Sequence, residues 1–307
     1  MTHPAHSTGD FAASFQIQGR AVRGRVARMS AGSIGPILAR HDYPTHLASL
    51  LGEAVALAAL VGASLKFDGR ILVQAEADDG VVRMLVGEYS TRGGVRGYAR
   101  YDAEAWTTLD RINKGKAPHM PQLFGRTGRL GLILIQDNPN IQPYQGVVPL
   151  TKGTLAQCAE DYFAMSEQVP TRVRLSVEET ASGEWTAGGM MIQRVAGDET
   201  RGDTDEDWRQ AEALFATLTP GELSDTGLPA TELLYRLFHE QGVSLEDGVP
   251  VTDHCTCNED RLIQTLRQMP DDALHDLVEP DGTLAIDCQF CARHYTIPIT
   301  RVTGPVN

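Results

Sequence analysis

The segment 47–65, LASLLGEAVALAALVGASL, carries one charged residue, Glu53, and is otherwise rich in alanine and leucine. Both residue types favour a helix. A helix that is apolar on nearly every face is stable only where other elements cover it. We therefore predict that this segment, which Tyr43-Pro44-Thr45 opens, is the central helix of a domain.

Strand-forming runs lie on both sides of this segment. Asp78-Asp79-Gly80 joins two of them, and this turn sequence predicts a hairpin because Asp-Gly tolerates positive φ angles. Ala181-Ser182-Gly183 predicts a second hairpin in the same way. The expected strands are 15–28, 71–77, 81–86, 95–101, 130–136, 173–179 and 185–195. With the central helix they predict an α+β fold, a mixed helix-and-sheet body over residues 11–195.

One further helix is expected within this body. Leu155, Cys158 and Tyr162 follow one another at helical spacing, which predicts a helix over 155–166. On such a helix Cys158 faces the core. We therefore interpret its thiol as a buried apolar group without a redox role.

The body ends at an acidic segment. Residues 197–207 hold six acids and one arginine, a composition that cannot bury enough surface to fold alone. Two amphipathic helices are predicted beyond it, over 208–218 and 230–240, and their apolar faces need another surface to pack on. We predict a helical linker over 196–250.

Four of the five cysteines form two close pairs near the C-terminus, Cys255-Thr256-Cys257 and Cys288-Gln289-Phe290-Cys291. Four thiolates are the ligand set that tetrahedral zinc prefers, and a site filled by sulfur leaves no open position for Lewis-acid catalysis. About fifty residues with few apolar anchors fold with difficulty on hydrophobic burial alone. The sequence therefore predicts a small zinc-binding module over 251–300, in which a helix capped by Asn258 follows the first pair and a hairpin carries the second pair at its turn.

Other interpretations of these cysteines stay open at this stage. The zinc site could be purely structural, and a disulfide-stabilised secreted module is disfavoured because no secretory signal is expected in the polar segment 1–10. His254 and His294 flank the pairs and could each replace a sulfur, but with four cysteines present we expect both to be exposed to solvent.

Composition narrows the classes of function. The chain has 27 basic and 40 acidic residues, a net charge of −13, which disfavours binding to nucleic acid. The apolar run 54–65 is too short to cross a bilayer, so we expect a cytoplasmic protein without a membrane partner. The sequence has no phosphate-binding Gly-x-x-x-x-Gly-Lys motif and no His-Glu-x-x-His motif, so we expect neither ATP hydrolysis nor metalloprotease activity.

Several segments together resemble the heat-shock protein 33 family of redox-regulated holdase chaperones. The cysteine pattern is the first of them, and the others are 50–53 (LLGE), 65–69 (LKFDG), 144–148 (YQGVV), 160–171 (EDYFAMSEQVPT), 188–190 (GGM) and 234–240 (LYRLFHE). Asn258 replaces the serine usual in the family, and Tyr295-Thr296-Ile297-Pro298 replaces a more aromatic ending. The resemblance covers about residues 15 to 300.

The resemblance implies a chaperone, not an enzyme, that binds unfolding client proteins without ATP under oxidative stress. It implies that Cys255, Cys257, Cys288 and Cys291 bind zinc in the reduced, inactive state. On oxidation, disulfides Cys255–Cys257 and Cys288–Cys291 would form, zinc would leave, and the module and linker would unfold. An active homodimer and reductants of the thioredoxin or glutaredoxin type would complete the cycle.

Two rival functions are weighed beside this one. A thiol-disulfide oxidoreductase would use Cys288-Gln289-Phe290-Cys291 catalytically, but this motif does not open a helix in the predicted structure. A structural zinc module that binds RNA or the ribosome would conflict with the acidic charge. A thiol turnover assay tests the first rival, and salt-dependent binding to nucleic acid tests the second.

Overall fold

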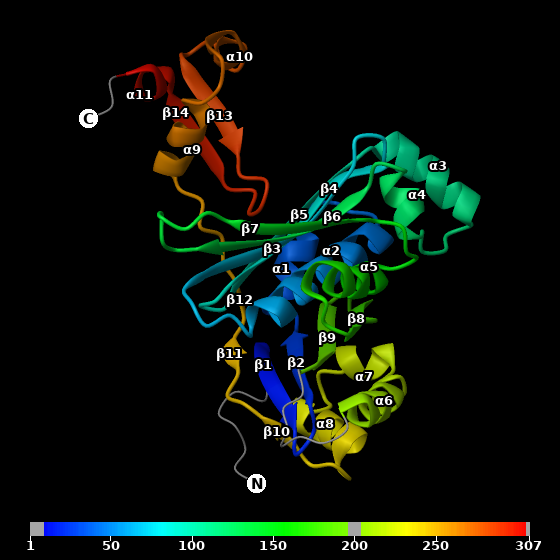
Figure 1. Cartoon of the computed structure of the whole chain (residues 1–307). Helices are drawn as coiled ribbons and strands as arrows, with labels where there is room; N and C mark the ends of the chain where they lie inside the picture. Colours follow the sequence, from blue (N-terminus) through cyan, green and yellow to red (C-terminus); the bar gives the residue numbers. More distant parts are fainter. Residues whose placement is uncertain (1–8, 196–203, 305–307) are drawn as a thin grey trace. The chain divides into compact units, whose positions relative to one another are not determined.

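The computed structural model describes residues 9–195 and 204–304. The predicted polar start of the chain up to residue 8 and the first part of the acidic segment, 196–203, lie outside the described residues. The chain divides into two compact units, Met1–Asp253 and His254–Asn307. Figure 1 shows the elements of both units.

The central element of the first unit is helix α2, Thr45–Gly62. The sequence predicts this helix, and the predicted C-terminal end differs from the observed one by three residues. It is long and apolar enough to cross a membrane, but 78% of it is buried inside the fold, as in a core helix. Two sheets lie against it. A Cβ at Gly87 of one sheet would lie 2.4 Å from the Ala54 backbone, and a Cβ at Gly189 of the other would lie 2.8 Å from the Leu60 side chain.

The first sheet has the strand order β10-β1-β2-β9-β8, with β11 also paired to β1. The predicted single strand 15–28 is wrong, because the chain turns at residues 18–21, where Gly19 has a φ of +66°, and forms a hairpin. The hairpin β8–β9 is confirmed. The strands are β1 Phe11–Ile17, β2 Val22–Met29, β8 Thr171–Glu179, β9 Trp185–Arg194, β10 Val243–Leu245 and β11 Val249–Pro250.

The second sheet has the order β12-β5-β4-β3-β6-β7. The predicted hairpin around Asp78-Asp79-Gly80 is confirmed, but Gly80 does not have a positive φ. Glycine is required at position 80 because a Cβ there would lie 2.7 Å from backbone atoms of Leu123 and Phe124. The strands are β3 Gly69–Glu76, β4 Val82–Ser90, β5 Gly94–Tyr101, β6 Arg129–Gln136, β7 Tyr144–Pro149 and β12 Thr252–Asp253.

Short helices complete the body. The predicted helix 155–166 is present as α5 Leu155–Tyr162, which continues into a π-helical turn, Phe163–Glu167. Further helices of the body were not predicted from the sequence: α1 Ile34–Ala39, α3 Ala103–Asn113 and α4 Met120–Phe124.

The linker belongs to the first unit. Its two predicted helices are present as α6 Thr204–Phe215 and α8 Ala230–Phe238, and a short helix α7 Pro220–Ser224 lies between them. After α8 the linker is not helical. It adds β10 and β11 to the first sheet, and β12, directly after the linker, joins the second sheet. These pairings were not predicted.

The second unit is small. It contains α9 Glu259–Leu266, α10 Asp271–His275, the antiparallel hairpin of β13 Thr283–Asp287 and β14 His294–Pro298, and α11 Ile299–Thr303. The capped helix after the first cysteine pair and the hairpin that carries the second are both as predicted. Its buried apolar residues are Ile263, Leu266, Leu274, Leu284, Ile297 and Val302.

Candidate functional site

The first cysteine pair lies directly before helix α9. The Asn258 side chain caps this helix by accepting a hydrogen bond of 2.9 Å from the Arg261 backbone N–H. Asparagine is as good as serine at this position because its side-chain oxygen satisfies a free N–H of the first turn. The cap fixes the direction in which the chain leaves Cys257.

The second pair occupies the loop between β13 and β14. The Ala292 N–H donates to the Cys288 carbonyl at 2.7 Å, and the Cys288 N–H donates to the Arg293 carbonyl at 2.9 Å. Ala292 has a φ of +53°, a left-handed conformation that closes the loop tightly. The Cys-x-x-Cys motif therefore lies in a hairpin loop, where a thiol lacks the helix N-terminus that lowers its pKa in oxidoreductases.

The fold brings all four sulfurs together, within 4.8 Å of one another. The Sγ atoms of Cys255 and Cys288 are 3.8 Å apart, and those of Cys257 and Cys291 are 3.3 Å apart. Four sulfurs placed tetrahedrally at the Zn–S distance of about 2.3 Å lie about 3.8 Å from one another. None of the four cysteines is part of a disulfide, and the positions of their sulfurs fit a tetrahedral soft cation.

The environment of the cluster is uneven. Burial opposes ionisation of Cys257, but hydrogen bonds from Tyr295 and from the other three cysteines outweigh it, so the pKa of Cys257 falls to about 7. Burial and the bonds shared with the same cysteines raise the pKa of Cys291. A bound cation would favour the thiolate form of all four.

The other predicted residues lie where the sequence analysis expects them. His254 and His294 are exposed, and the His294 ring contacts the Asp287 carboxylate at 2.8 Å. Cys158 is fully buried in the main core. The contact of Tyr295, whose hydroxyl donates to the Cys257 Sγ at 3.1 Å, was not predicted from the sequence. Tyr295 stands in the segment 295–298, which differs from the family pattern because it is less aromatic.

A second candidate site is the face of the first sheet that the linker covers. This covered face carries the buried residues Phe11, Ala13, Phe15, Ile17, Val22, Val26, Met190 and Ile192. Trp208, Phe215, Leu234 and Phe238 are among the linker residues that pack on it. Since α2 packs on the opposite face, departure of the linker would expose a continuous apolar surface on the sheet and a second one on the linker helices.

Polar anchors surround the covered face. The Arg28 side chain donates to the carbonyls of Asp225 and Glu222 at 2.6 and 2.9 Å, where α7 ends. Buried Asp207, at the start of α6, pairs with Arg20 and accepts a hydrogen bond of 3.2 Å from the Ala21 N–H. Basic groups of the body thus hold the linker through acidic groups and a helix C-terminus.

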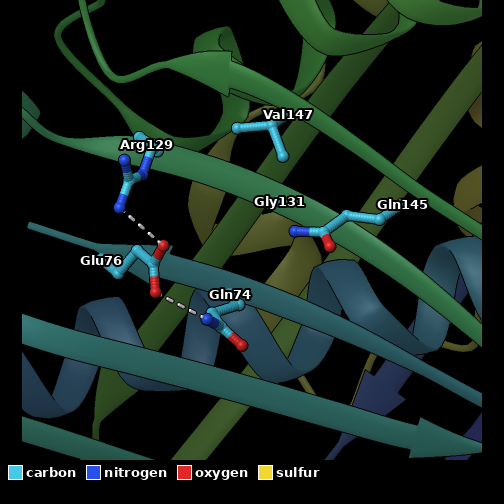
Figure 2. A pocket seen from close by; sticks show the side chains of 6 residues that line it. All are labelled: Gln74, Glu76, Arg129, Gly131, Gln145 and Val147. Atoms are coloured by element: carbon cyan, nitrogen blue, oxygen red, sulfur yellow. Dashed lines mark hydrogen bonds and ion pairs between the residues drawn. The ribbon is translucent and has the colours of Figure 1, made fainter.

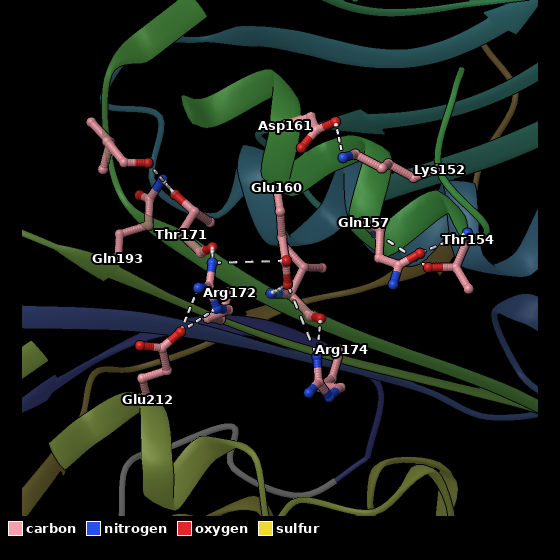
Figure 3. A network of polar contacts seen from close by, with 12 residues as sticks. Lys152, Thr154, Gln157, Glu160, Asp161, Thr171, Arg172, Arg174, Gln193 and Glu212 are labelled. Carbon is pink, nitrogen blue, oxygen red and sulfur yellow. Dashed lines mark hydrogen bonds and ion pairs between the residues drawn. The ribbon is translucent and has the colours of Figure 1, made fainter. Parts of the chain in front are cut away.

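Figure 3 shows the most extended of these anchors. Arg172 on β8 lies between Glu160 of α5 and Glu212 of α6, and its Nε donates to the Glu212 carboxylate at 2.6 Å. Glu160 also accepts a hydrogen bond of 2.8 Å from the Val173 N–H. Arg174 lies over the Phe215 ring, 5.5 Å from its centroid. The body therefore contacts α6 through charge and aromatic packing together.

A shallow pocket of about 290 Å³ lies on the second sheet and is drawn in Figure 2. Its charged groups satisfy each other, since Glu76 pairs with Arg129 at 3.1 Å and accepts a hydrogen bond from Gln74 at 2.9 Å. Both charged groups that line the pocket are thus engaged in contacts within the protein.

Comparison with known proteins agrees with this architecture. The family model described as Hsp33 protein matches residues 10–298. A "33 kDa chaperonin" of Caulobacter vibrioides is 45% identical over 304 residues, which are 97% of this chain and 98% of the relative. One of Hahella chejuensis is 34% identical over 86% of each chain.

A solved structure supports the fold. The crystal structure of a 33 kDa chaperonin, a heat shock protein 33 homologue of Thermotoga maritima, superposes with a TM-score of 0.77 over 95% of this chain and 96% of that one, at 23% identity. The relatives are named as chaperonins, not as enzymes. By the family match and the near full-length identity, this chain belongs to the Hsp33 family of chaperones.

Proposed function

We propose that this chain is a redox-regulated, ATP-independent holdase that binds unfolding proteins under oxidative stress. Cys255, Cys257, Cys288 and Cys291 hold one zinc ion in the reduced, inactive protein. The observation that carries the proposal is the convergence of these four sulfurs within 4.8 Å, from two loops more than thirty residues apart in sequence. Bound zinc stabilises a small module by about 10 to 16 kcal/mol at neutral pH.

Oxidation removes the ligands. A thiolate of one pair attacks peroxide, the O–O bond breaks, and a sulfenic acid and water result after protonation. The second thiol of the pair displaces water from the sulfenic acid and closes the disulfide, so each bond consumes one peroxide and two electrons come from the two sulfurs. Disulfides form as Cys255–Cys257 and Cys288–Cys291. Thioredoxin- or glutaredoxin-type reductants return the electrons.

The second unit depends on these ligands because its apolar core is small, with six buried residues in the part of the unit that the structure describes. Chain continuity supports coupling to the linker. Strand β12, directly after the linker, pairs with β5, and the Asp253 carboxylate pairs with Arg40, two residues before Cys255. Unfolding of the cysteine module therefore adds a disordered chain directly after this anchor and favours release of the linker.

Clients bind to the covered face and to the apolar faces of α6 and α8 once the linker leaves. We further propose three functional parts, a body over 11–195, a linker over 196–250 and a redox switch over 251–300. The active form is a homodimer in the cytoplasm, and neither nucleic acid nor a membrane is a partner. The near-complete burial of the apolar residues on the covered face supports an inactive reduced state.

The experiment is light scattering of a heat-unfolding client, with the protein supplied zinc-bound and reduced, and then after peroxide at elevated temperature. Suppression of aggregation by the oxidised form alone, without ATP, supports the proposal. Equal suppression by both forms, or by neither, contradicts it. A reductant added after oxidation is the matched control, because it restores the inactive form if disulfides are the trigger.

A further inference from the structure

Tyr295 joins the two halves of the cysteine cluster. It lies on β14, four residues after Cys291, where the strand register places it opposite Ile286. Its hydroxyl reaches the sulfur of Cys257 in the other pair, at 3.1 Å and 38 residues away in sequence. A side chain on the strand that follows the second cysteine pair thus contacts a sulfur of the first cysteine pair.

The contact has the geometry of a donated hydrogen bond. The phenol O–H is the donor, and the sulfur is the acceptor. The Arg293 guanidinium also forms a hydrogen bond with the phenol and interacts with the charges of Cys257 and Cys291. Arg293, directly before β14, and Tyr295, on β14, therefore place a positive charge and a donor proton near the Cys257 sulfur.

The Tyr295 ring has a separate structural role. It is half-buried and packs against the small apolar cluster of the second unit. Removal of the ring and removal of the hydroxyl are therefore different perturbations. Substitution by phenylalanine removes only the hydroxyl.

We propose that the Tyr295 hydroxyl is a hydrogen-bond donor to the Cys257 ligand sulfur and controls how tightly the site holds its metal and how readily that sulfur reacts. This inference rests on the proposed zinc site. A hydrogen bond to a metal-bound thiolate withdraws charge from sulfur, which relieves repulsion among four anionic ligands and lowers the reactivity of the acceptor sulfur. Loss of a hydrogen-bond partner of a metal ligand lowers the affinity for the metal by about 10- to 100-fold.

The test is Tyr295→Phe in the full chain. Zinc affinity is measured by competition with a coloured chelator, and cobalt is substituted for zinc to record the sulfur-to-cobalt charge-transfer band. We expect zinc to bind about 10- to 100-fold more weakly and the band to move to longer wavelength, because the sulfur lone pair rises in energy without the donor. With zinc in saturating excess, alkylation of Cys257 by iodoacetamide, followed by mass spectrometry, should become faster, while alkylation of Cys288 should change little.

Two controls separate the hydroxyl from the ring. Tyr235→Phe removes a hydroxyl from an exposed tyrosine of α8 and should leave all three readouts unchanged. Tyr295→Leu removes the ring as well, and should lower the melting temperature of the second unit further than Tyr295→Phe does. If Tyr295→Phe does not fold, the unmodified protein loaded with an NMR-active cadmium isotope provides the test, because a bonded hydroxyl proton shows scalar coupling to the metal through Cys257.

The outcomes distinguish this inference from the function on which it rests. Absence of zinc from the unmodified reduced protein would overturn the proposed function. Zinc bound with equal affinity by the unmodified chain and by Tyr295→Phe, with an unshifted cobalt band, would overturn the role of Tyr295 alone. Absence of the cadmium coupling would do the same.

Discussion

Cys158 differs from the other four cysteines in its surroundings. It is fully buried among apolar residues of the main core, and burial raises the pKa of its thiol. A protonated thiol without solvent access does not react with peroxide. We therefore predict that Cys158→Ser keeps peroxide activation, measured by client light scattering, but loses about 1–3 kcal/mol of folding stability because a hydroxyl replaces an apolar group.

Cys158→Ala is the matched control for this substitution, since it removes the thiol without adding a hydroxyl. Both variants should show the same activation after correction for the folded fraction, measured by circular dichroism. A folded Cys158→Ser protein that peroxide no longer activates would show that the four-cysteine switch is incomplete.

Residue roles could be predicted where the chemistry is local in sequence. The two cysteine pairs, the Asn258 cap and the exposure of His254 depend on neighbours within a few positions. Tyr295 and Arg172 could not be assigned in this way. Their partners, Cys257 and Glu212, are 38 and 40 residues away, and the contacts exist only because particular strands and helices pack together.

At the scale of elements, Gly188 on β9 determines how closely the linker approaches the sheet. A Cβ at this position would lie 2.0 Å from the Leu223 carbonyl oxygen of α7. We predict that Gly188→Ala displaces α7 at a cost of about 1–3 kcal/mol, which raises the population of open linker roughly 5- to 150-fold. Hydrogen exchange across 220–238 should accelerate, and the reduced protein should bind clients without peroxide.

The neighbouring Gly189 provides a control on the opposite face of the same strand. A Cβ there meets the flexible end of the Leu60 side chain of α2, at 2.8 Å. Gly189→Ala should therefore lower the stability of the body and leave exchange in the linker near that of the unmodified protein. Equal exchange in the linker of both variants would contradict the role of Gly188.

Elements could be predicted where one signal dominates. The central helix follows from its composition, and the hairpin β3–β4 from its Asp-Gly turn. The strands β10, β11 and β12 are two or three residues long and exist only through pairing with distant strands of the body, so their local sequence does not reveal them. The turn between β1 and β2 was not predicted because the alternation of apolar and polar residues continues across it.

At the scale of the whole molecule, metal removal tests the dependence of the second unit on its ligands. We predict that a strong chelator in the presence of reductant removes one zinc per chain and unfolds residues 254–304, while the central helix α2 stays protected. Metal analysis with thiol counting and hydrogen exchange measure the two effects. The variant with Cys255, Cys257, Cys288 and Cys291 all changed to serine should contain no zinc, and zinc retained by it would contradict the ligand assignment.

The last prediction concerns the order of oxidation. Cys288 and Cys291 lie in a hairpin loop, where a Cys-x-x-Cys disulfide closes with little strain. Cys255 and Cys257 are two positions apart before α9 and close a smaller, more strained ring. In the zinc-bound state, where all four sulfurs are thiolates, the hydroxyl of Tyr295 also donates to the Cys257 sulfur, which lowers the reactivity of that pair. We predict that Cys288–Cys291 forms first and that Cys255–Cys257 follows once the unit has loosened.

Stepwise thiol trapping with mass spectrometry, at low and at elevated temperature, resolves this order. At low temperature peroxide should produce the Cys288–Cys291 bond and zinc loss with little client binding, because the linker anchors at Asp207, Arg28 and Arg172 remain in place. Heat should then release the linker, allow the second bond and produce full activity. Appearance of the Cys255–Cys257 disulfide first would refute the order of oxidation. Zinc loss that leaves 208–240 fully protected from hydrogen exchange at elevated temperature would refute the coupling between cysteine module and linker. Both expectations follow from the same series of events, which is ligand loss, unfolding of the module and release of the linker.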